Sequence, residues 1–156
     1  MRMIPSRLAF VLLLLVGGCA APEPPFASLA ATIPPPAPGQ ARIFFYRWLE
    51  PYETLTPTTA YLNDAAVGVT ETGAVLYRDV APGRYLVAVD SEGVYTNQFK
   101  TVILRPGDIA YIRVESLRSW SNCRTRTTGC WDTFVVNVIN PAVALDEMRD
   151  LRLIHG

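Results

Sequence analysis

The 156-residue sequence has few of the side chains that usually carry out catalysis: one histidine, His155, and three cysteines. It has no Gly-x-Ser-x-Gly elbow and no His-Glu-x-x-His pair, so the common serine-hydrolase and zinc-peptidase motifs are absent. Acid–base and nucleophilic catalysis need two reactive groups within hydrogen-bond reach. No two such groups occur in the sequence at a spacing typical of a catalytic pair. We therefore predict a protein that is not an enzyme and has no cofactor or metal; a hydrolase with an unrecognised site is the remaining alternative.

The sequence also has no excess charge of either sign, with 14 basic and 14 acidic side chains. Nucleic-acid binding draws most of its affinity from a concentration of positive charge. A near-neutral chain therefore argues against a nucleic-acid partner.

No apolar run is long enough to cross a bilayer, which takes about 20 residues. The longest run is the nine-residue stretch from Leu8 to Val16, preceded by Arg2 and Arg7, and this is the pattern of a secretory signal peptide. The residues that follow, Val16-Gly17-Gly18-Cys19, resemble the lipobox of bacterial lipoproteins. An ordinary signal peptide with a chance cysteine is the alternative.

The lipobox resemblance implies a signal peptide over residues 1–18, cleavage before Cys19, and lipidation of Cys19 with palmitate-type acyl chains. Ala20 stands where an aspartate would favour the inner membrane, so the resemblance implies the periplasmic face of the outer membrane. Each buried methylene contributes about 0.8 kcal/mol, so several acyl chains hold a protein firmly.

Residues 19–40 are rich in proline and alanine. Proline fixes φ and has no N–H to donate, so the segment predicts a semi-extended polyproline tether, with a reach of roughly 60 Å at about 3.1 Å per residue. A docked segment and an SH3-type ligand are the alternatives. The prolines are Pro22, Pro24, Pro25, Pro34, Pro35, Pro36 and Pro38.

Residues 41–156 predict a single, mainly β domain. Ala41–Arg47 has apolar residues on both faces, which favours a strand inside a sandwich. Asn63-Asp64 suits a two-residue hairpin turn between 59–63 and 66–70. Pro-Gly pairs at 82–83 and 106–107 suggest type II turns joining antiparallel neighbours in a β-meander. Further strands are expected at 74–79, 84–90, 97–104, 109–115 and 131–139.

A short helix is expected at the C-terminal end. Asn140 can cap it and Pro141 suits its first position. Apolar residues then recur at helical spacing, at Ala144, Leu145, Met148 and Leu151. The fold class predicted is an antiparallel β-sandwich with a short C-terminal α-helix.

Residues 41–151 resemble the bacterial lipoprotein family called domain of unknown function 2846. The resemblance is carried by Tyr46-Arg47, the turn region Asn63–Gly68, Val80-Ala-Pro-Gly83, Ile109–Arg113 and the alanine-containing last helix. The central part is similar to PEGA-type and carboxypeptidase-regulatory-like β-sandwich modules. These motifs are structural, and the resemblance implies no activity and no catalytic residue.

Cys123 and Cys130 enclose six residues, and in an oxidising periplasm a disulfide is the first interpretation of such a pair. A metal pair is the alternative, but no further cysteine or histidine lies near it. Asp90 and Glu92 could contact calcium, although such residues more often form turns.

The loop around the two cysteines is the candidate binding site, because arginine and tryptophan together can hold phosphate or sugar groups. A solvated loop with Trp131 in the core is the alternative. The candidate residues are Arg118, Trp120, Arg124, Arg126 and Trp131.

The sequence therefore predicts an outer-membrane-anchored periplasmic lipoprotein that acts as a non-catalytic binding or structural module of the cell envelope. The alternative is a glycan- or lipid-binding accessory protein that uses the loop at 118–131. The expected partners are the membrane, through the anchor, and an envelope protein or glycan.

Overall fold

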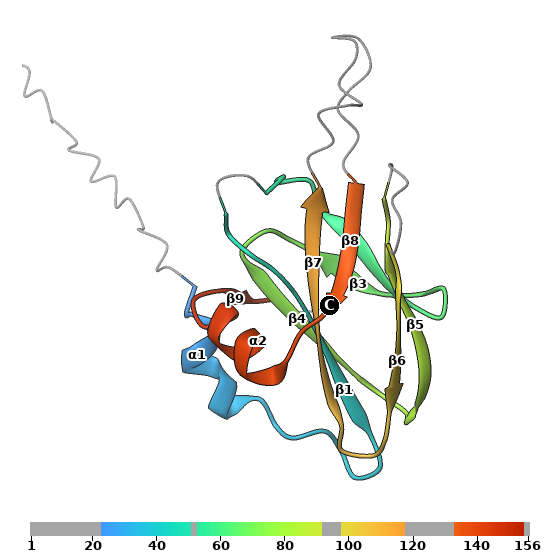
Figure 1. Cartoon of the computed structure of the whole chain (residues 1–156). Helices are drawn as coiled ribbons and strands as arrows, with labels where there is room; N and C mark the ends of the chain where they lie inside the picture. Colours follow the sequence, from blue (N-terminus) through green and yellow to red (C-terminus); the bar gives the residue numbers. More distant parts are fainter. Residues whose placement is uncertain (1–22, 51–52, 92–97, 118–132, 155–156) are drawn as a thin grey trace, which may run out of the picture.

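The computed structural model describes residues 23–50, 53–91, 98–117 and 133–154, and in these residues nine strands form two sheets (Figure 1). Sheet A has the strand order β8-β7-β1-β4-β9, and sheet B has the order β3-β2-β5-β6. The mainly β architecture confirms the predicted fold class. The strands are β1 Ala41–Arg47, β2 Thr58–Leu62, β3 Ala65–Thr70, β4 Ala74–Val80, β5 Gly83–Val89, β6 Lys100–Leu104, β7 Ile109–Leu117, β8 Thr133–Val138 and β9 Arg152–Leu153.

Strand β1 lies at the centre of sheet A, as its two apolar faces predict. All seven of its residues are buried. It pairs antiparallel with β4 and parallel with β7, so sheet A is mixed rather than purely antiparallel. Ile43 and Phe45 face sheet B, and Phe44 and Tyr46 face the opposite side.

The space between the sheets is filled by aliphatic and aromatic side chains from both. Their burial removes apolar surface from water at roughly 25 cal/mol per Å², which is the main force holding the two layers together. The buried set includes Ile43, Phe45, Leu62, Leu76, Val87, Leu104, Ile112, Phe134 and Val136.

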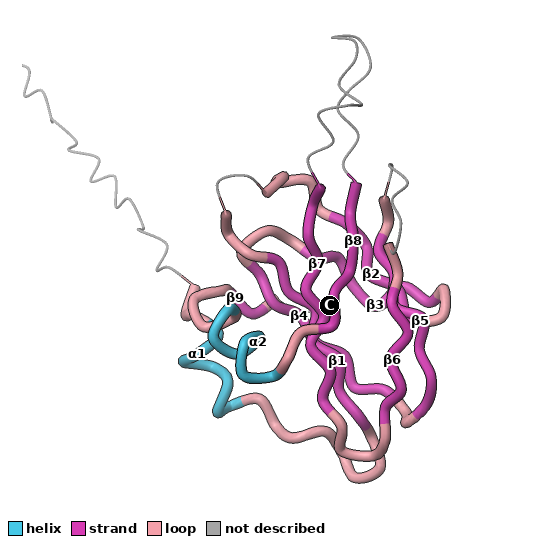
Figure 2. The backbone as a smooth tube through the Cα atoms, in the orientation of Figure 1, coloured by secondary structure: helices cyan, strands magenta, loops and turns pink. Residues whose placement is uncertain are grey.

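The outer face of sheet A is covered by helices α1, Phe26–Leu29, and α2, Pro141–Glu147, which lie on the same side of it (Figure 2). A 3₁₀ turn, Ala30–Thr32, continues α1. Neither helix is long and apolar enough to cross a bilayer, and the described residues contain no other α-helix.

The prediction of an extended tether is wrong for the described part of residues 19–40. Phe26 is only 3% exposed and packs edge-on against Phe44, with ring centroids 5.8 Å apart. The backbone N–H groups of Phe26 and Ala27 donate to the carbonyls of Leu151 and Arg149. Proline content alone predicts an extended chain. The segment docks because Phe26 is buried on the apolar outer face of sheet A.

The hairpin predicted at Asn63-Asp64 is confirmed, because both residues adopt positive φ angles, 48° and 66°, between β2 and β3. The C-terminal helix is also confirmed: Pro141 is its first residue, and the Asn140 side chain accepts a hydrogen bond from the N–H of Ala142 at 3.0 Å.

The two Pro-Gly turns differ from the prediction, because each carries the chain from one sheet to the other. The first joins β4 in sheet A to β5 in sheet B, and the second joins β6 in sheet B to β7 in sheet A. Gly107 has φ +84°, as a type II turn requires, and Asp108 N–H donates to the Arg105 carbonyl. Gly83 has no positive φ and simply begins β5. The antiparallel neighbours in sequence are β2–β3, β5–β6 and β7–β8.

Candidate functional site

The predicted binding loop and the three cysteines lie outside the described residues. The structure does place the two residues that flank the loop: Leu117 ends β7, Thr133 begins β8, and the two are register partners. The chain therefore leaves and re-enters sheet A at one point, at the end of the sandwich (Figure 1). The predicted residues not described are Cys19, Arg118, Trp120, Cys123, Arg124, Arg126, Cys130 and Trp131.

This end of the sandwich is tied together by side chains from two connecting segments, the one between β1 and β2 and the one between β5 and β6. Glu53 accepts hydrogen bonds from the N–H and hydroxyl of Ser116, the latter at 2.9 Å. On the other side, Ser91 Oγ accepts from the N–H of Phe134 at 3.0 Å, and Gln98 donates to both Ser91 Oγ and the Phe134 carbonyl. The flanks of the loop at 118–132 thus rest on a hydrogen-bonded base.

Arg47 lies beneath the same end and its side chain has no exposed surface. Its guanidinium donates to the carbonyls of Thr56 at 2.8 Å and Thr54 at 2.7 Å, lies 3.5 Å from Glu53 and stacks over the Phe134 ring. A buried charge is costly unless it is paired and hydrogen-bonded. The carbonyls and Glu53 supply these partners to Arg47. The same contacts fix the segment after β1 to the core, which is a structural role.

A second polar cluster lies on the outer face of sheet A, beneath α2. Glu147 accepts from the Tyr46 hydroxyl at 2.5 Å and from Arg113 Nη1 at 2.8 Å. Glu115 approaches Arg113 Nε at 2.7 Å and accepts from the Asn137 amide. Burial, together with Glu147, raises the pKa of Tyr46 far above its usual range, so the phenol remains a proton donor. The protonated phenol and the carboxylate paired with arginine hold α2 on the outer face of sheet A.

Trp48 completes this cluster. The Arg113 guanidinium lies 4.4 Å from the centre of the Trp48 ring, within cation–π range. The buried indole N–H has no acceptor among the described residues. The stacking orients Arg113 toward its two carboxylates.

At the opposite end of β1, Arg42 pairs with Asp79 through two hydrogen bonds, at 2.6 and 2.8 Å, and also donates to the Pro34 carbonyl. Its guanidinium stacks on the Tyr77 ring at 4.3 Å. The hydrogen bonds from Arg42 lower the pKa of Asp79 and Asp79 raises that of Arg42. This pair clamps the proline-rich segment onto sheet A, so Asp79 is structural.

Asp90, a candidate calcium contact, instead accepts a hydrogen bond from the Tyr61 hydroxyl at 3.0 Å, and its backbone N–H donates to the Thr59 carbonyl. Glu92 lies outside the described residues. Within the described ranges, no three histidine, cysteine, aspartate or glutamate side chains gather where they could hold a metal ion.

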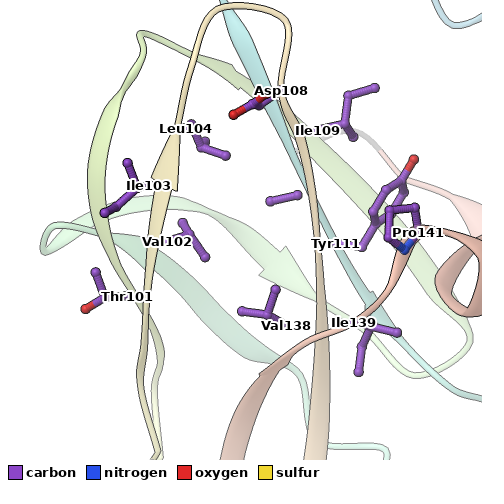
Figure 3. Close-up of a pocket in the computed structure, with 11 residues that line it drawn as sticks. Thr101, Val102, Ile103, Leu104, Asp108, Ile109, Tyr111, Val138, Ile139 and Pro141 are labelled. Carbon is purple, nitrogen blue, oxygen red and sulfur yellow. The ribbon is translucent and has the colours of Figure 1, made fainter.

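An open groove of about 530 Å³ lies where the two sheets separate beside the β6–β7 turn (Figure 3). Val102 and Leu104 of β6 form one wall. Ala110 and Tyr111 of β7, Val138 at the end of β8 and Ile139 just after it form the other. The lining side chains are mainly aliphatic and aromatic, but Thr101, the carboxylate of Asp108 and backbone groups make the surface of the groove about as polar as it is apolar.

Sequence reasoning missed the buried arginines and the cluster under α2. A signal was present for Arg42 and Arg47, since a basic residue near each end of an otherwise apolar strand must be paired when buried. Nothing in the sequence indicates that Glu147 meets Tyr46, 101 positions earlier. That contact depends on how α2 packs on the sheet.

No protein-family model matches the chain, and no curated protein matches it. The lipoprotein-family resemblance stays a prediction.

Proposed function

We propose that this protein is a bacterial lipoprotein, anchored through lipidated Cys19 to the periplasmic face of the outer membrane, and that its sandwich is a non-catalytic binding or structural module of the cell envelope. The observation that carries the proposal is the docking of the chain soon after the lipobox-like motif. Phe26 follows Cys19 by seven residues and is buried on sheet A.

The docking restricts how far the module can stand from its anchor. At about 3.6 Å per residue, the seven residues from Cys19 to Phe26 reach at most roughly 25 Å. A free segment up to Ala41 would allow a far longer span. A lipid on Cys19 therefore keeps the sandwich near the membrane surface, which suits a module that acts on membrane-proximal components. The resemblance of residues 41–151 to the lipoprotein family of unknown function supports the same assignment.

Metabolic labelling with an alkyne-bearing fatty acid tests the anchor. The wild-type chain should take up the label and fractionate with membranes. Cys19→Ser should stay unlabelled and should either leave the membrane fraction or remain an uncleaved precursor. Cys123→Ser is the matched control, because it removes another cysteine and should keep the label. If Cys19→Ser is labelled and membrane-bound like the wild type, the lipoprotein proposal is wrong.

The non-catalytic part of the proposal has its own test. Separate replacement of Asp79, Asp90, Glu92, Asp132 and His155 by alanine should leave a cellular phenotype intact wherever the fold survives. Loss of the phenotype in one carboxylate variant, with folding and membrane attachment unchanged, would reject a non-enzymatic role.

A glycan- or lipid-binding function of the loop at 118–131 is the second candidate. The hydrogen-bonded base formed by Glu53, Ser116, Ser91, Gln98 and Phe134 favours it, because binding loops work best on a rigid support. A disulfide between the loop cysteines would stiffen the loop further.

Cosedimentation of the full chain with peptidoglycan or lipopolysaccharide tests this candidate. The triple variant Arg118→Glu, Arg124→Glu and Arg126→Glu should lose most of the binding. The control replaces two exposed arginines elsewhere, Arg84→Glu and Arg149→Glu, and should bind like the wild type. Equal binding by the triple variant and the wild type would exclude the loop as the binding surface.

A further inference from the structure

Strand β6 is the outermost strand of sheet B, and among the described residues only β5 pairs with it. Two exposed apolar side chains lie on this edge, Ile103 at 73% within the strand and Phe99 at 60% just before it. Most edge strands are protected against pairing by bulges, prolines or shortness. The opposite edge, β3, has a register irregularity in its pairing with β2; in sheet A the edge strand β9 has two residues, and the edge strand β8 is regular. Strand β6 is regular and has no proline.

The hydrogen bonds of β5 show which backbone groups of β6 point outward. The N–H of Leu86 donates to Asn63 Oδ1 at 2.8 Å and its carbonyl accepts from the N–H of Asn63 at 3.0 Å, so both point toward β2. Leu86 is the register partner of Thr101. Because pairs alternate in an antiparallel ladder, the N–H and carbonyl groups of Thr101 and Ile103 face away from β5, at the open edge.

We propose that β6 pairs antiparallel with β6 of a second copy of this chain, about a two-fold axis at Val102. This register sets Thr101 opposite Ile103 of the second copy, and Ile103 opposite its Thr101. The outward-facing residues then meet each other, and each of the two pairs exchanges both of its backbone hydrogen bonds. The strand is complementary to itself in this register, as a two-fold interface requires.

The side chains in this register are compatible as well. Lys100 lies opposite Leu104 of the second copy, and Phe99 lies opposite Arg105, so no like charges face each other. A parallel pairing in register would place Lys100 beside Lys100. On the outer face, each exposed Ile103 gains a threonine neighbour across the interface, which covers apolar surface that is open in the single chain.

Two double variants of the purified full chain, examined by light scattering and sedimentation, test the pairing. T101K/I103K places lysines opposite lysines across the interface. Its dimer dissociation constant should be at least tenfold higher than that of the wild type, so that it is monomeric. T101E/I103K carries the same number of charged side chains on the same face but places glutamate opposite lysine, and should remain dimeric like the wild type. A monomeric wild type, or equal association of the two variants, overturns the proposal.

A cysteine at the two-fold axis tests the register. Val102 faces Val102 of the second copy as a non-hydrogen-bonded pair, whose Cα atoms lie about 4.5 Å apart, within the range of a disulfide. Val102→Cys should give a reducible covalent dimer above the level of the wild type, which has its own cysteines. Thr101→Cys, one residue from the axis, should not. Cross-linking by Thr101→Cys and not by Val102→Cys would refute this register.

Discussion

Replacement of Phe26 by alanine is expected to release the N-terminal segment from the outer face of sheet A. The Phe26 side chain is 3% exposed and packs against Phe44. Truncation of a buried phenylalanine costs about 3–5 kcal/mol. At tenfold per 1.4 kcal/mol, the undocked population should rise by between about a hundredfold and a few thousandfold. The substitution should destabilise the docking of the N-terminal segment and leave the core between the sheets unchanged, because Phe26 belongs to the cluster on the outer face of sheet A.

Hydrogen–deuterium exchange measures this docking directly. In the wild type, the amides of Phe26 and Ala27 are bonded to the carbonyls of Leu151 and Arg149 at 2.6 and 3.0 Å and should exchange slowly. In Phe26→Ala both amides should exchange at least a hundredfold faster, while those of β1 keep their protection. Ser28→Ala is the control, since among the described residues this exposed hydroxyl donates within its own turn, to the Pro25 carbonyl. Unchanged exchange in Phe26→Ala would refute the reasoning.

Arg47→Leu should lower the free energy of unfolding, measured in urea, by about 3 kcal/mol or more, because it leaves two buried carbonyls and a carboxylate without their partner. A loss under about 1 kcal/mol would contradict this role. The Arg42 guanidinium lowers the pKa of Asp79, so the ion pair stabilises the fold above the ordinary aspartate pKa and is lost as the pH falls through the lowered one. Asp79→Asn should therefore reduce the melting temperature at neutral pH and flatten its fall in acid, and an acid limb identical to that of the wild type would count against the pair. Mass spectrometry without reductant should find Cys123 joined to Cys130, and alkylation of both as free thiols would exclude the bond.

The strands and the helix were predictable because their signals are local. Apolar residues on both faces mark β1, the positive φ angles tolerated by Asn63 and Asp64 mark the first hairpin, and Asn140 marks the start of α2. Each feature depends on residues only a few positions apart, so the sequence carries it without reference to the rest of the chain.

The sheet to which each strand belongs was not predictable in this way. A Pro-Gly turn reverses the chain whether the next strand joins the same sheet or the facing one, and here both turns change sheets. The parallel pairing of β1 with β7 likewise joins segments more than 60 residues apart. Sheet membership and strand pairing depend on how apolar faces are buried across the whole domain. A local sequence pattern contains no information about that burial.

The residue types at the polar clusters were visible in the sequence, but their roles were not. The sequence by itself determined the strand-rich fold class, the lipobox-like motif at Cys19 and the near-neutral charge. The tertiary structure alone decided that Phe26 docks the proline-rich segment, that Glu147 meets Tyr46 and Arg113, and that β6 is the last strand of sheet B in the described residues. The physical reason is that local conformation follows from backbone and side-chain preferences within a few residues. Docking, ion pairing and edge exposure depend instead on which distant surfaces become buried together.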